Sequence, residues 1–372
     1  MKLLYLTCNQ FPSRMANSQQ ILNTSRGLNK LLNKDFLLIV ARAPEPLGGV
    51  NYKEVGFNKK GLRTFYYLFW TFKFFLKNIN KKDYNVVYCR DSNLLLILSF
   101  LKIFFHYKIA FEYHRFEKTR KEKFIIKHAD CFIVITNYFK ELLIKKFNIS
   151  KEKIVVVPDA VDLKIFEAVN NSMLDIRREL NLPLNKKLIG FIGRFKTKGE
   201  EKGIKTMIES LKFLEDLNVM MCFVGGIDDE IEEYQEMANK YSFEKKCIFI
   251  KYQTAERVPL YAKAMDILVM PFPWTEHYAY YISPMKLFEY MAARKPIVAS
   301  DLPSIREILN NNNAILIKPD DPKALAEVIN KVLTNVNLVK RISNQAYKDV
   351  QKYTWEKRAK RIINFLNNQN IV

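Results

Sequence analysis

The chain has 372 residues, of which 49% are hydrophobic and 27% charged, and its formal net charge is +21. This hydrophobic share excludes a disordered protein, and the length suffices for two or three globular domains. The longest apolar run, residues 94–105, contains Lys102 and is shorter than the roughly 20 residues of a membrane span, so we expect no transmembrane helix. Met1-Lys2 leads directly into a strand-like run, and we therefore expect no signal peptide.

The cysteines and histidines show no pattern typical of a disulfide framework or of a metal site. An odd number of cysteines, each in or beside a strand-like segment, indicates reduced core thiols of a cytoplasmic protein. The histidines also lack the spacing of metal ligands, so we predict no metal. These residues are Cys8, Cys89, Cys131, Cys222, Cys247, His106, His114, His128 and His277.

The positive charge lies mainly in the amino-terminal part of the chain. Residues 1–150 contain 26 Lys and Arg against 10 Asp and Glu, a net charge of +16, whereas residues 151–372 contain 34 against 29, a net charge of +5. Such a basic surface suits nucleic acid, an anionic membrane or an acidic substrate. A lysine-rich composition with no partner is the remaining interpretation.

Strand-like apolar runs alternate with helix-length segments along the whole chain. Continuous Val, Ile and Leu runs separated by helices indicate parallel sheets covered on both faces. We predict an α/β protein with two doubly wound domains, residues 1–165 and 166–352, and an amphipathic helix within 353–372 that crosses back onto the first domain. The predicted strands are residues 2–7, 36–41, 85–89, 108–112, 131–136, 153–157, 188–192, 220–224, 247–251, 267–270, 296–300 and 314–317.

One predicted helix, residues 63–80, is crowded with aromatic side chains. Lys73, Lys77 and Lys81 recur every four residues along one side of it. Aromatic residues beside a lysine stripe are typical of a helix that lies in a membrane interface. A helix that covers a sheet and turns its lysines to water gives the same pattern, and the sequence does not separate the two interpretations.

The first candidate site follows the strand at 188–192. Gly193 allows the backbone to approach a ligand closely, and Arg194 and Lys202 place two positive charges beside the turn. Ligands of doubly wound folds bind at the carboxyl ends of the strands, and a diphosphate needs about this much positive charge.

The second candidate site is the start of a helix near residue 283. Ser283 suits the N-cap and Pro284 the first helical position, so free amides and the positive end of the helix dipole mark an anion site. Lys286 lies at that positive end, and Glu289 lies on the same face three residues later. A lysine for phosphate and a carboxylate for hydroxyls indicate a nucleotide-sugar. A surface ion pair on an ordinary helix is the alternative.

Taken together, these segments resemble the family 4 retaining glycosyltransferases of GT-B fold (glycosyl transferases group 1). The order of motifs carries the resemblance, which is specific over residues 188–309 and looser toward the amino terminus. The motifs are Gly193-Arg194, Lys202-Gly203, Phe223-Val224-Gly225-Gly226, the segment 259–267, Glu289-Tyr290-Met291-Ala292 and the segment 296–301, preceded by Phe111-Glu112-Tyr113-His114 and the inter-domain segment 155–162.

The resemblance implies a fold of two Rossmann-like domains facing a central cleft, and a role for each matching residue. Arg194 and Lys202 correspond to the pair that holds the donor diphosphate and stabilises the departing nucleotide. Glu289 corresponds to the glutamate that binds the ribose hydroxyls, and His114 to a histidine beside the transferred sugar. Tyr252 and Val258 fall where the family holds the nucleobase.

The motif departs from the family pattern at Tyr281, where the first glutamate of E-x7-E is expected. A similar branch carries an SPxKxFEYMA-type motif, which implies that Ser283 and the amides around Met285 and Lys286 contact the donor instead. Glu276, in the preceding loop, is a candidate for the missing carboxylate. The resemblance implies a reaction that retains anomeric configuration by front-side attack and that does not generally need a metal.

We therefore expect a cytoplasmic, membrane-attached glycosyltransferase that uses a nucleotide-sugar as substrate, has no cofactor, and acts on a lipid-linked or polysaccharide acceptor. Its expected partners are the donor, the acceptor and the anionic inner face of the cell membrane, without nucleic acid. The sequence leaves the oligomeric state open. A non-catalytic GT-B relative or partner subunit, a basic nucleic-acid-binding protein and a sugar epimerase of the same fold are the alternatives.

Overall fold

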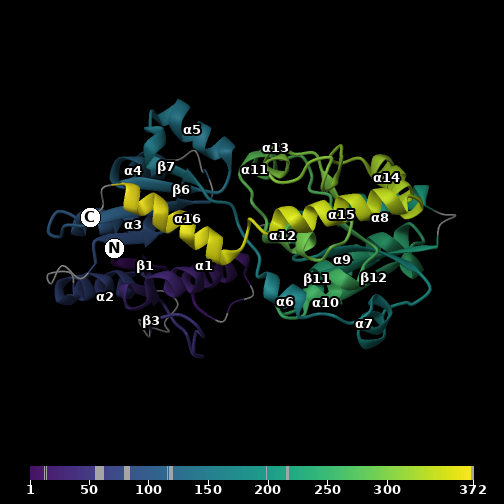
Figure 1. Cartoon of the computed structure of the whole chain (residues 1–372), viewed down its shortest axis with the longest axis horizontal. Coiled ribbons are helices and arrows are strands. Elements are labelled where there is room, and N and C mark those ends of the chain that lie inside the picture. The colour runs from purple at the N-terminus through teal and green to yellow at the C-terminus, as the bar shows by residue number, and fades with distance from the viewer. Residues whose placement is uncertain are drawn as a thin grey trace. The chain divides into compact units, whose positions relative to one another are not determined.

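The computed structural model describes residues 1–11, 13, 15–54, 63–78, 84–114, 116, 120–197, 199–214 and 218–369. The chain divides into two compact units (Figure 1). Unit 1 comprises Met1–Asp159 with Trp355–Val372, and unit 2 comprises Ala160–Thr354. Each unit contains its own parallel sheet covered by helices.

Unit 1 contains, among its described residues, a sheet of seven parallel strands in the order β3-β2-β1-β4-β5-β6-β7. All six strands predicted in this half are present. The three-residue strand β3 was not predicted, because its side chains are polar and largely exposed and therefore form no apolar run. The strands are β1 (Leu3–Leu6), β2 (Phe36–Val40), β3 (Tyr52–Glu54), β4 (Val86–Cys89), β5 (Lys108–Tyr113), β6 (Cys131–Val134) and β7 (Ile154–Val156).

Helices α1 (Ala16–Leu32) and α16 (Trp355–Asn368) pack against each other beside the sheet of unit 1 (Figure 1). Gly27 makes this close approach possible, because a Cβ atom there would lie 2.7 Å from the carbonyl oxygen of Trp355. The last helix of the chain is therefore part of unit 1. The remaining helices of this unit are α2 (Arg63–Asn78), α3 (Ser92–Leu101), α4 (Arg120–His128) and α5 (Asn137–Phe147).

Within its described residues, unit 2 contains six parallel strands in the order β12-β11-β8-β13-β14-β15, and the sequence predicts all six. A short antiparallel pair, β9 (Lys196–Thr197) and β10 (Glu200–Glu201), follows the first strand of the unit and was not predicted. The six strands are β8 (Lys187–Ile192), β11 (Val219–Gly226), β12 (Cys247–Lys251), β13 (Ile267–Met270), β14 (Ile297–Ser300) and β15 (Ile315–Ile317).

Alternate residues of the unit 2 strands face two separate hydrophobic cores. Leu188 and Ile192 of β8 pack in one core, and Ile189 and Phe191 of the same strand pack in the other. The first core includes residues of α6 (Leu163–Glu167), α7 (Met173–Glu179), α10 (Val258–Ala264), α11 (Glu276–Tyr280), α12 (Met285–Ala292), α13 (Pro303–Arg306) and α15 (Val336–Val350); the second includes residues of α8 (Ile204–Ser210), α9 (Asp228–Lys240) and α14 (Pro322–Thr334).

The chain passes from unit 1 to unit 2 after Asp159, six residues before the predicted boundary. The difference arises because Val161 and Leu163 already pack in the first core of unit 2. The chain returns to unit 1 between Thr354 and Trp355, two residues after the predicted boundary. In each sheet the strand order reverses beside the first strand of the unit, which is where doubly wound folds bind ligands.

Candidate functional site

Lys286, in the first turn of α12, is a buried cation. Lys286 is 8% exposed, and its Nζ lies 3.4 Å from the centroid of the Phe191 ring. Within the described part of the chain this Nζ has no hydrogen-bond partner. Burial, followed by the charge of Lys202, holds the pKa of Lys286 well below its usual range, although Glu289 opposes this effect. An anion placed here would satisfy an amine that is otherwise unpaired.

Helix α12 begins one residue later than the sequence indicated, so the prediction of Ser283 as N-cap is wrong. Pro284 occupies that position, with an extended backbone, and its carbonyl oxygen accepts the first helical hydrogen bond from Leu287 N at 2.9 Å. Proline has no side-chain acceptor, and Ser283 lies outside the helix. The amides of Met285 and Lys286 belong to the first turn, whose N–H groups have no acceptor within the helix.

Arg194 follows the end of β8 and is held by Glu230 of α9. Its Nη2 donates to Glu230 Oε1 at 2.8 Å, and the Arg194 side chain remains 39% exposed. Glu230 was not identified from the sequence, where it is one of three acidic residues that open a helix after Gly225-Gly226. Gly225 has φ 116°, and a Cβ atom there would lie 2.8 Å from the Gly193 carbonyl group, so only glycine permits these two loops to touch.

Lys202 lies in the loop before α8, close to the same two cations. Burial, followed by the charge of Arg194, lowers the pKa of Lys202 to about 8, while Glu230 opposes the change. Lys202 in turn lowers the pKa of Lys286. The structure therefore brings Arg194, Lys202 and Lys286 to one end of the unit 2 sheet, and we call these three residues the cationic cluster.

Glu289 lies one helical turn after Lys286 and is half-buried. Burial raises the pKa of this carboxyl group to about 7, although the charge of Lys286 opposes the shift. A hydroxyl ligand that donates to the carboxylate would favour the ionised form. Lys286 and Glu289 thus lie close together on α12, as their three-residue spacing predicted.

The two residues expected beside a nucleobase follow β12. The amide of Tyr252 donates to the Gly226 carbonyl oxygen at 3.0 Å, which places Tyr252 at the carboxyl end of β11. Val258 is half-buried and begins α10. Both therefore lie on the carboxyl-end side of the sheet, as does the cationic cluster.

Tyr281, at the position of the expected glutamate, is buried at the end of α11. Its hydroxyl oxygen lies 3.5 Å from Glu276 Oε1. Glu276 is the first residue of α11 and not part of the preceding loop. A carboxylate is therefore present near position 281, supplied by the other end of a short helix.

His114 directly follows β5 in unit 1 and belongs to a buried polar network. Its Nε2 lies 2.7 Å from Glu112 Oε1, and its side chain is 19% exposed. Burial and the charge of Arg90 lower the pKa of His114 to about 4, against the opposing effect of Glu112. The ring is therefore neutral at physiological pH.

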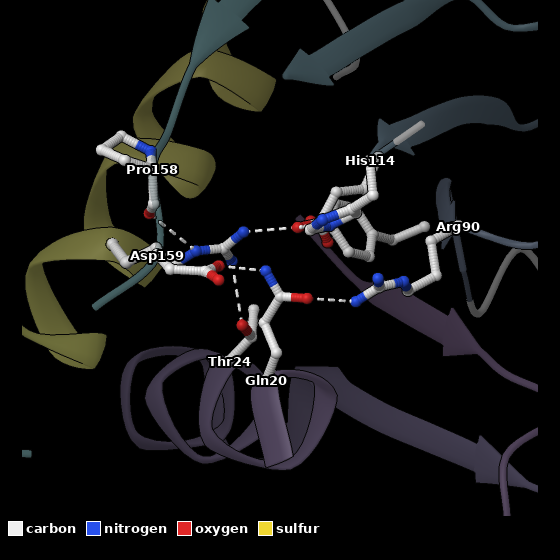
Figure 2. A network of polar contacts seen from close by, with 9 residues as sticks. Gln20, Thr24, Arg90, His114, Pro158 and Asp159 are labelled. Carbon is white, nitrogen blue, oxygen red and sulfur yellow. Dashed lines mark hydrogen bonds and ion pairs between the residues drawn. The ribbon is translucent and has the colours of Figure 1, made fainter. Parts of the chain in front are cut away.

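Figure 2 shows Gln20 between Arg90 and Asp159 in this network. The Gln20 side-chain amide donates to Asp159 and accepts from Arg90. Burial raises the pKa of Asp159 to about 7, with Arg358 opposing. We call the whole set the His114 network; its members are Gln20, Thr24, Tyr88, Arg90, Glu112, His114, Pro158, Asp159 and Arg358.

The described residues lack two features. They contain no group of three or more His, Cys, Asp or Glu side chains placed to hold a metal ion. They also contain no helix that is both long and apolar enough to cross a membrane.

Family comparisons match both units of the chain. Residues 172–349 match the family model described as glycosyl transferases group 1, and residues 18–165 match the model of glycosyltransferase family 4. Together the two matches span most of the chain, which is thus similar to glycosyltransferases in both of its units.

Curated relatives are distant and longer than the matched segment. An uncharacterized glycosyltransferase of Methanocaldococcus jannaschii is 25% identical over 249 residues, 65% of this chain and 61% of that protein. A D-inositol 3-phosphate glycosyltransferase of Corynebacterium urealyticum is 23% identical over 259 residues, 67% and 60% of the two chains. TuaH of Bacillus subtilis, a glycosyltransferase named for teichuronic acid biosynthesis, is 26% identical over 213 residues, 56% and 50%. The match thus spans 50–61% of these relatives' length.

Solved structures show the same fold over the full chain. A glycosyltransferase from Rickettsia africae has a TM-score of 0.80 at 16% identity and covers 99% of this chain and 98% of its own. Anabaena HepE, in complex with UDP and glucose, has a TM-score of 0.77 at 15% identity, with 99% of each chain covered. These likenesses establish the GT-B architecture of two Rossmann-like domains.

Proposed function

We propose that this protein is a retaining glycosyltransferase that moves a sugar from a nucleoside-diphosphate donor to a glycan or lipid-linked acceptor in surface glycan synthesis. The cationic cluster is the observation that carries the proposal. It combines an unpaired buried amine, a lysine with a lowered pKa and an arginine fixed by Glu230 at one sheet end. Matched family segments and the UDP and glucose of the HepE complex support a nucleotide-sugar donor.

The charges of the cluster suit the departure of a nucleoside diphosphate. As the bond between the sugar C1 atom and the diphosphate oxygen breaks, negative charge grows on that oxygen. Arg194, Lys202 and Lys286 neutralise this charge, which is electrostatic stabilisation of the transition state. The acceptor hydroxyl attacks C1 on the same face, and its proton passes to the departing phosphate. We expect the reaction to proceed without a metal, because three side chains supply the positive charge.

Nucleotide screening followed by site variants tests this proposal. Thermal shift with UDP, GDP, ADP and CMP identifies the base, because a ligand that binds only the folded state raises the apparent stability. Transfer and hydrolysis of the matching sugar donors are then measured for Lys286→Ala and Glu289→Gln. We expect Lys286→Ala to lower the rate about 100-fold. The control is Lys205→Ala, a lysine with 57% side-chain exposure, which should have wild-type activity.

A non-catalytic nucleotide-sugar-binding relative is the second candidate, and Tyr281 favours it. A tyrosine replaces the carboxylate that the motif usually brings to the transferred sugar. Nucleotide binding with no turnover of any donor would support this second function. Unchanged activity in both Lys286→Ala and Glu289→Gln would instead remove the proposed site.

Association with an anionic membrane surface forms the second part of the proposal, and exposed side chains of unit 1 support it. Helix α3 packs between α2 and α4. Helix α3 and the turn after it expose four large apolar side chains, and helices α2 and α4 expose lysines. The apolar residues are Leu96, Phe100, Ile103 and Phe104, exposed by 57–74%, and the lysines are Lys73, Lys77, Lys123 and Lys127. Lys81, the third lysine of the predicted stripe, lies outside the described residues.

Exposed apolar side chains next to two lysine-bearing helices fit the headgroup region of an anionic bilayer. Apolar side chains enter the acyl boundary, and each nearby lysine adds about 1 kcal/mol of attraction to anionic lipid. The inner face of a cell membrane carries such lipids, and a lipid-linked acceptor would be met there.

Vesicle sedimentation tests the membrane surface. We expect the protein to bind vesicles that contain about one third anionic lipid and to leave neutral vesicles unbound. The double variant Phe100→Ser with Phe104→Ser should lose most of this binding. Phe213→Ser, which changes an equally exposed phenylalanine of unit 2, is the control and should bind as the wild type does. Equal binding to neutral vesicles, or no binding at all, would contradict this part of the proposal.

A further inference from the structure

Glu112 is a fully buried carboxylate at the end of β5 that contacts three polar side chains. Its Oε1 lies 2.7 Å from His114 Nε2 and accepts from Arg358 Nη2, and its Oε2 accepts from the Tyr88 hydroxyl. Glu112 and His114 are two residues apart at the end of a strand, so their side chains lie on one face of the sheet. Tyr113 between them packs against Phe139.

Arg358 reaches this carboxylate from α16, 246 residues further along the chain. Its Nε donates to the Pro158 carbonyl oxygen at 3.2 Å, and its Nη1 donates to Thr24 Oγ1 at 2.9 Å. The guanidinium is therefore held on three sides, and its side chain is only 1% exposed. It has no freedom to leave Glu112.

We propose that Glu112 and Arg358 are positioning residues that hold the His114 ring in the tautomer protonated at Nε2, so that Nδ1 is offered as an acceptor to a substrate hydroxyl. The inference rests on the proposed function, because that function makes a sugar hydroxyl the partner of Nδ1. The tautomer follows from which of these side chains can donate a hydrogen bond and which can only accept one. An ionised carboxylate only accepts and a guanidinium only donates, so the shared hydrogen between Glu112 and His114 belongs to the imidazole. A neutral imidazole has a single N–H, so Nδ1 carries a lone pair.

The charge states required by this arrangement agree with the surroundings. Burial alone would raise the pKa of Glu112, but Arg358, His114 and Arg90 together hold it well below its usual range. Burial and Arg90 keep His114 neutral. Arg358 thus fixes Glu112, and Glu112 orients His114, as orienting carboxylates do for other functional histidines.

Nitrogen NMR of the four histidines measures the tautomer without relying on activity. Long-range ¹H–¹⁵N spectra are recorded for the wild type from pH 5.5 to 8, and His114→Gln assigns the signal. We expect the Nε2–H pattern for His114 and no titration over this range. An Nδ1–H pattern, or a protonated ring at pH 6.5, would overturn the inference.

Variants then separate positioning from a purely structural role. The double variant Glu112→Met with Arg358→Met removes both partners of the buried pair together, which is tolerated far better than removal of one. Glu112→Gln keeps an acceptor oxygen for His114, and Tyr88→Phe removes a donor from Glu112 without touching the bond to His114.

For the double variant we expect mixed tautomers, a kcat about 10-fold lower, and unchanged affinity for the nucleotide, which binds in unit 2. Glu112→Gln and Tyr88→Phe should keep the wild-type tautomer and a kcat within a few-fold of it. A double variant that folds and retains full kcat would overturn the positioning role. Absence of transfer in the wild type with every donor would overturn the proposed function alone, because the NMR spectra still decide the tautomer.

Discussion

Gly193 leaves the space that the Lys286 ammonium group occupies. A Cβ atom on residue 193 would lie 2.9 Å from both Cε and Nζ of Lys286. The glycine has φ 126°, a conformation that residues with side chains rarely adopt. The first strand of unit 2 thus ends in a turn whose lack of a side chain lets a lysine from a distant helix approach the backbone.

Gly193→Ala should therefore weaken nucleotide binding in addition to straining the backbone at residue 193. The methyl group displaces the flexible end of Lys286, and we expect an affinity for nucleoside diphosphate about tenfold lower, equal to about 1.4 kcal/mol. Calorimetric titration measures it. Gly48→Ala, where a Cβ atom would meet open space, is the control and should bind as the wild type does. Equal affinities in the two variants would mean that Lys286 does not contact the ligand.

Gly203→Ala should be far more disruptive than Gly199→Ala. Both glycines have positive φ, 88° and 83°, so each substitution costs about 1–2 kcal/mol of backbone strain. At residue 203 a Cβ atom would also lie 1.9 Å from the Pro271 carbonyl oxygen, whereas residue 199 has nothing within 4 Å. Thermal unfolding compares the two. Similar melting temperatures would show that the loop holding Lys202 is not fixed against Pro271.

Nucleoside diphosphate affinity should fall as the pH rises above about 8. The pKa of Lys202 in the free protein is lowered to about 8, mainly by burial, so the side chain loses its proton there. A bound diphosphate favours the protonated lysine, and linkage then weakens binding by up to about tenfold per pH unit for each proton taken up. Titrations at pH 7, 8 and 9 measure the slope, and Lys202→Met should flatten it. An affinity independent of pH across this range would exclude Lys202 from the site.

Arg177 should contribute strongly to stability and little to nucleotide binding. It is 2% exposed, and it donates to Asp266 at 2.6 Å and to the Ala264 and Lys186 carbonyl oxygens. Arg177→Met leaves Asp266 buried without this cation, which should lower the free energy of unfolding by about 3–5 kcal/mol. Denaturant unfolding measures the loss. Its neighbour Arg178, exposed by 60%, provides the control, because Arg178→Met should change stability by no more than about 0.5 kcal/mol.

The sequence was sufficient to predict the sheets because their strands are continuous apolar runs. All twelve predicted strands are present. Among the residues that the structure describes, the strands missed are β3, β9 and β10, which are two or three residues long and polar or exposed. The motif spacing also predicted that Arg194, Lys202 and Lys286 lie near one another, since glycine turns and helix starts at the carboxyl ends of parallel strands lie at one edge of a sheet.

Sequence patterns could not predict which side chains far apart in the sequence contact each other. Arg194 and Glu230 are 36 residues apart, and Glu112 and Arg358 are 246 apart. No local pattern distinguishes Glu230 or Arg358 from the charged residues around them, because their roles depend on which elements pack together. The N-cap prediction at Ser283 failed for a local reason: Pro284 can occupy either the N-cap or the first helical position.

The central claim is that the cationic cluster binds the donor diphosphate. Proton uptake on nucleotide binding tests this claim most directly. UDP, GDP and ADP are each titrated into the protein at pH 8.5 in two buffers of different ionisation enthalpy, and the difference in heat gives the protons taken up. Lys202 and Lys286 both have lowered pKa values in the free protein, so the account predicts net proton uptake with the cognate nucleotide. Tight binding without proton uptake would contradict it.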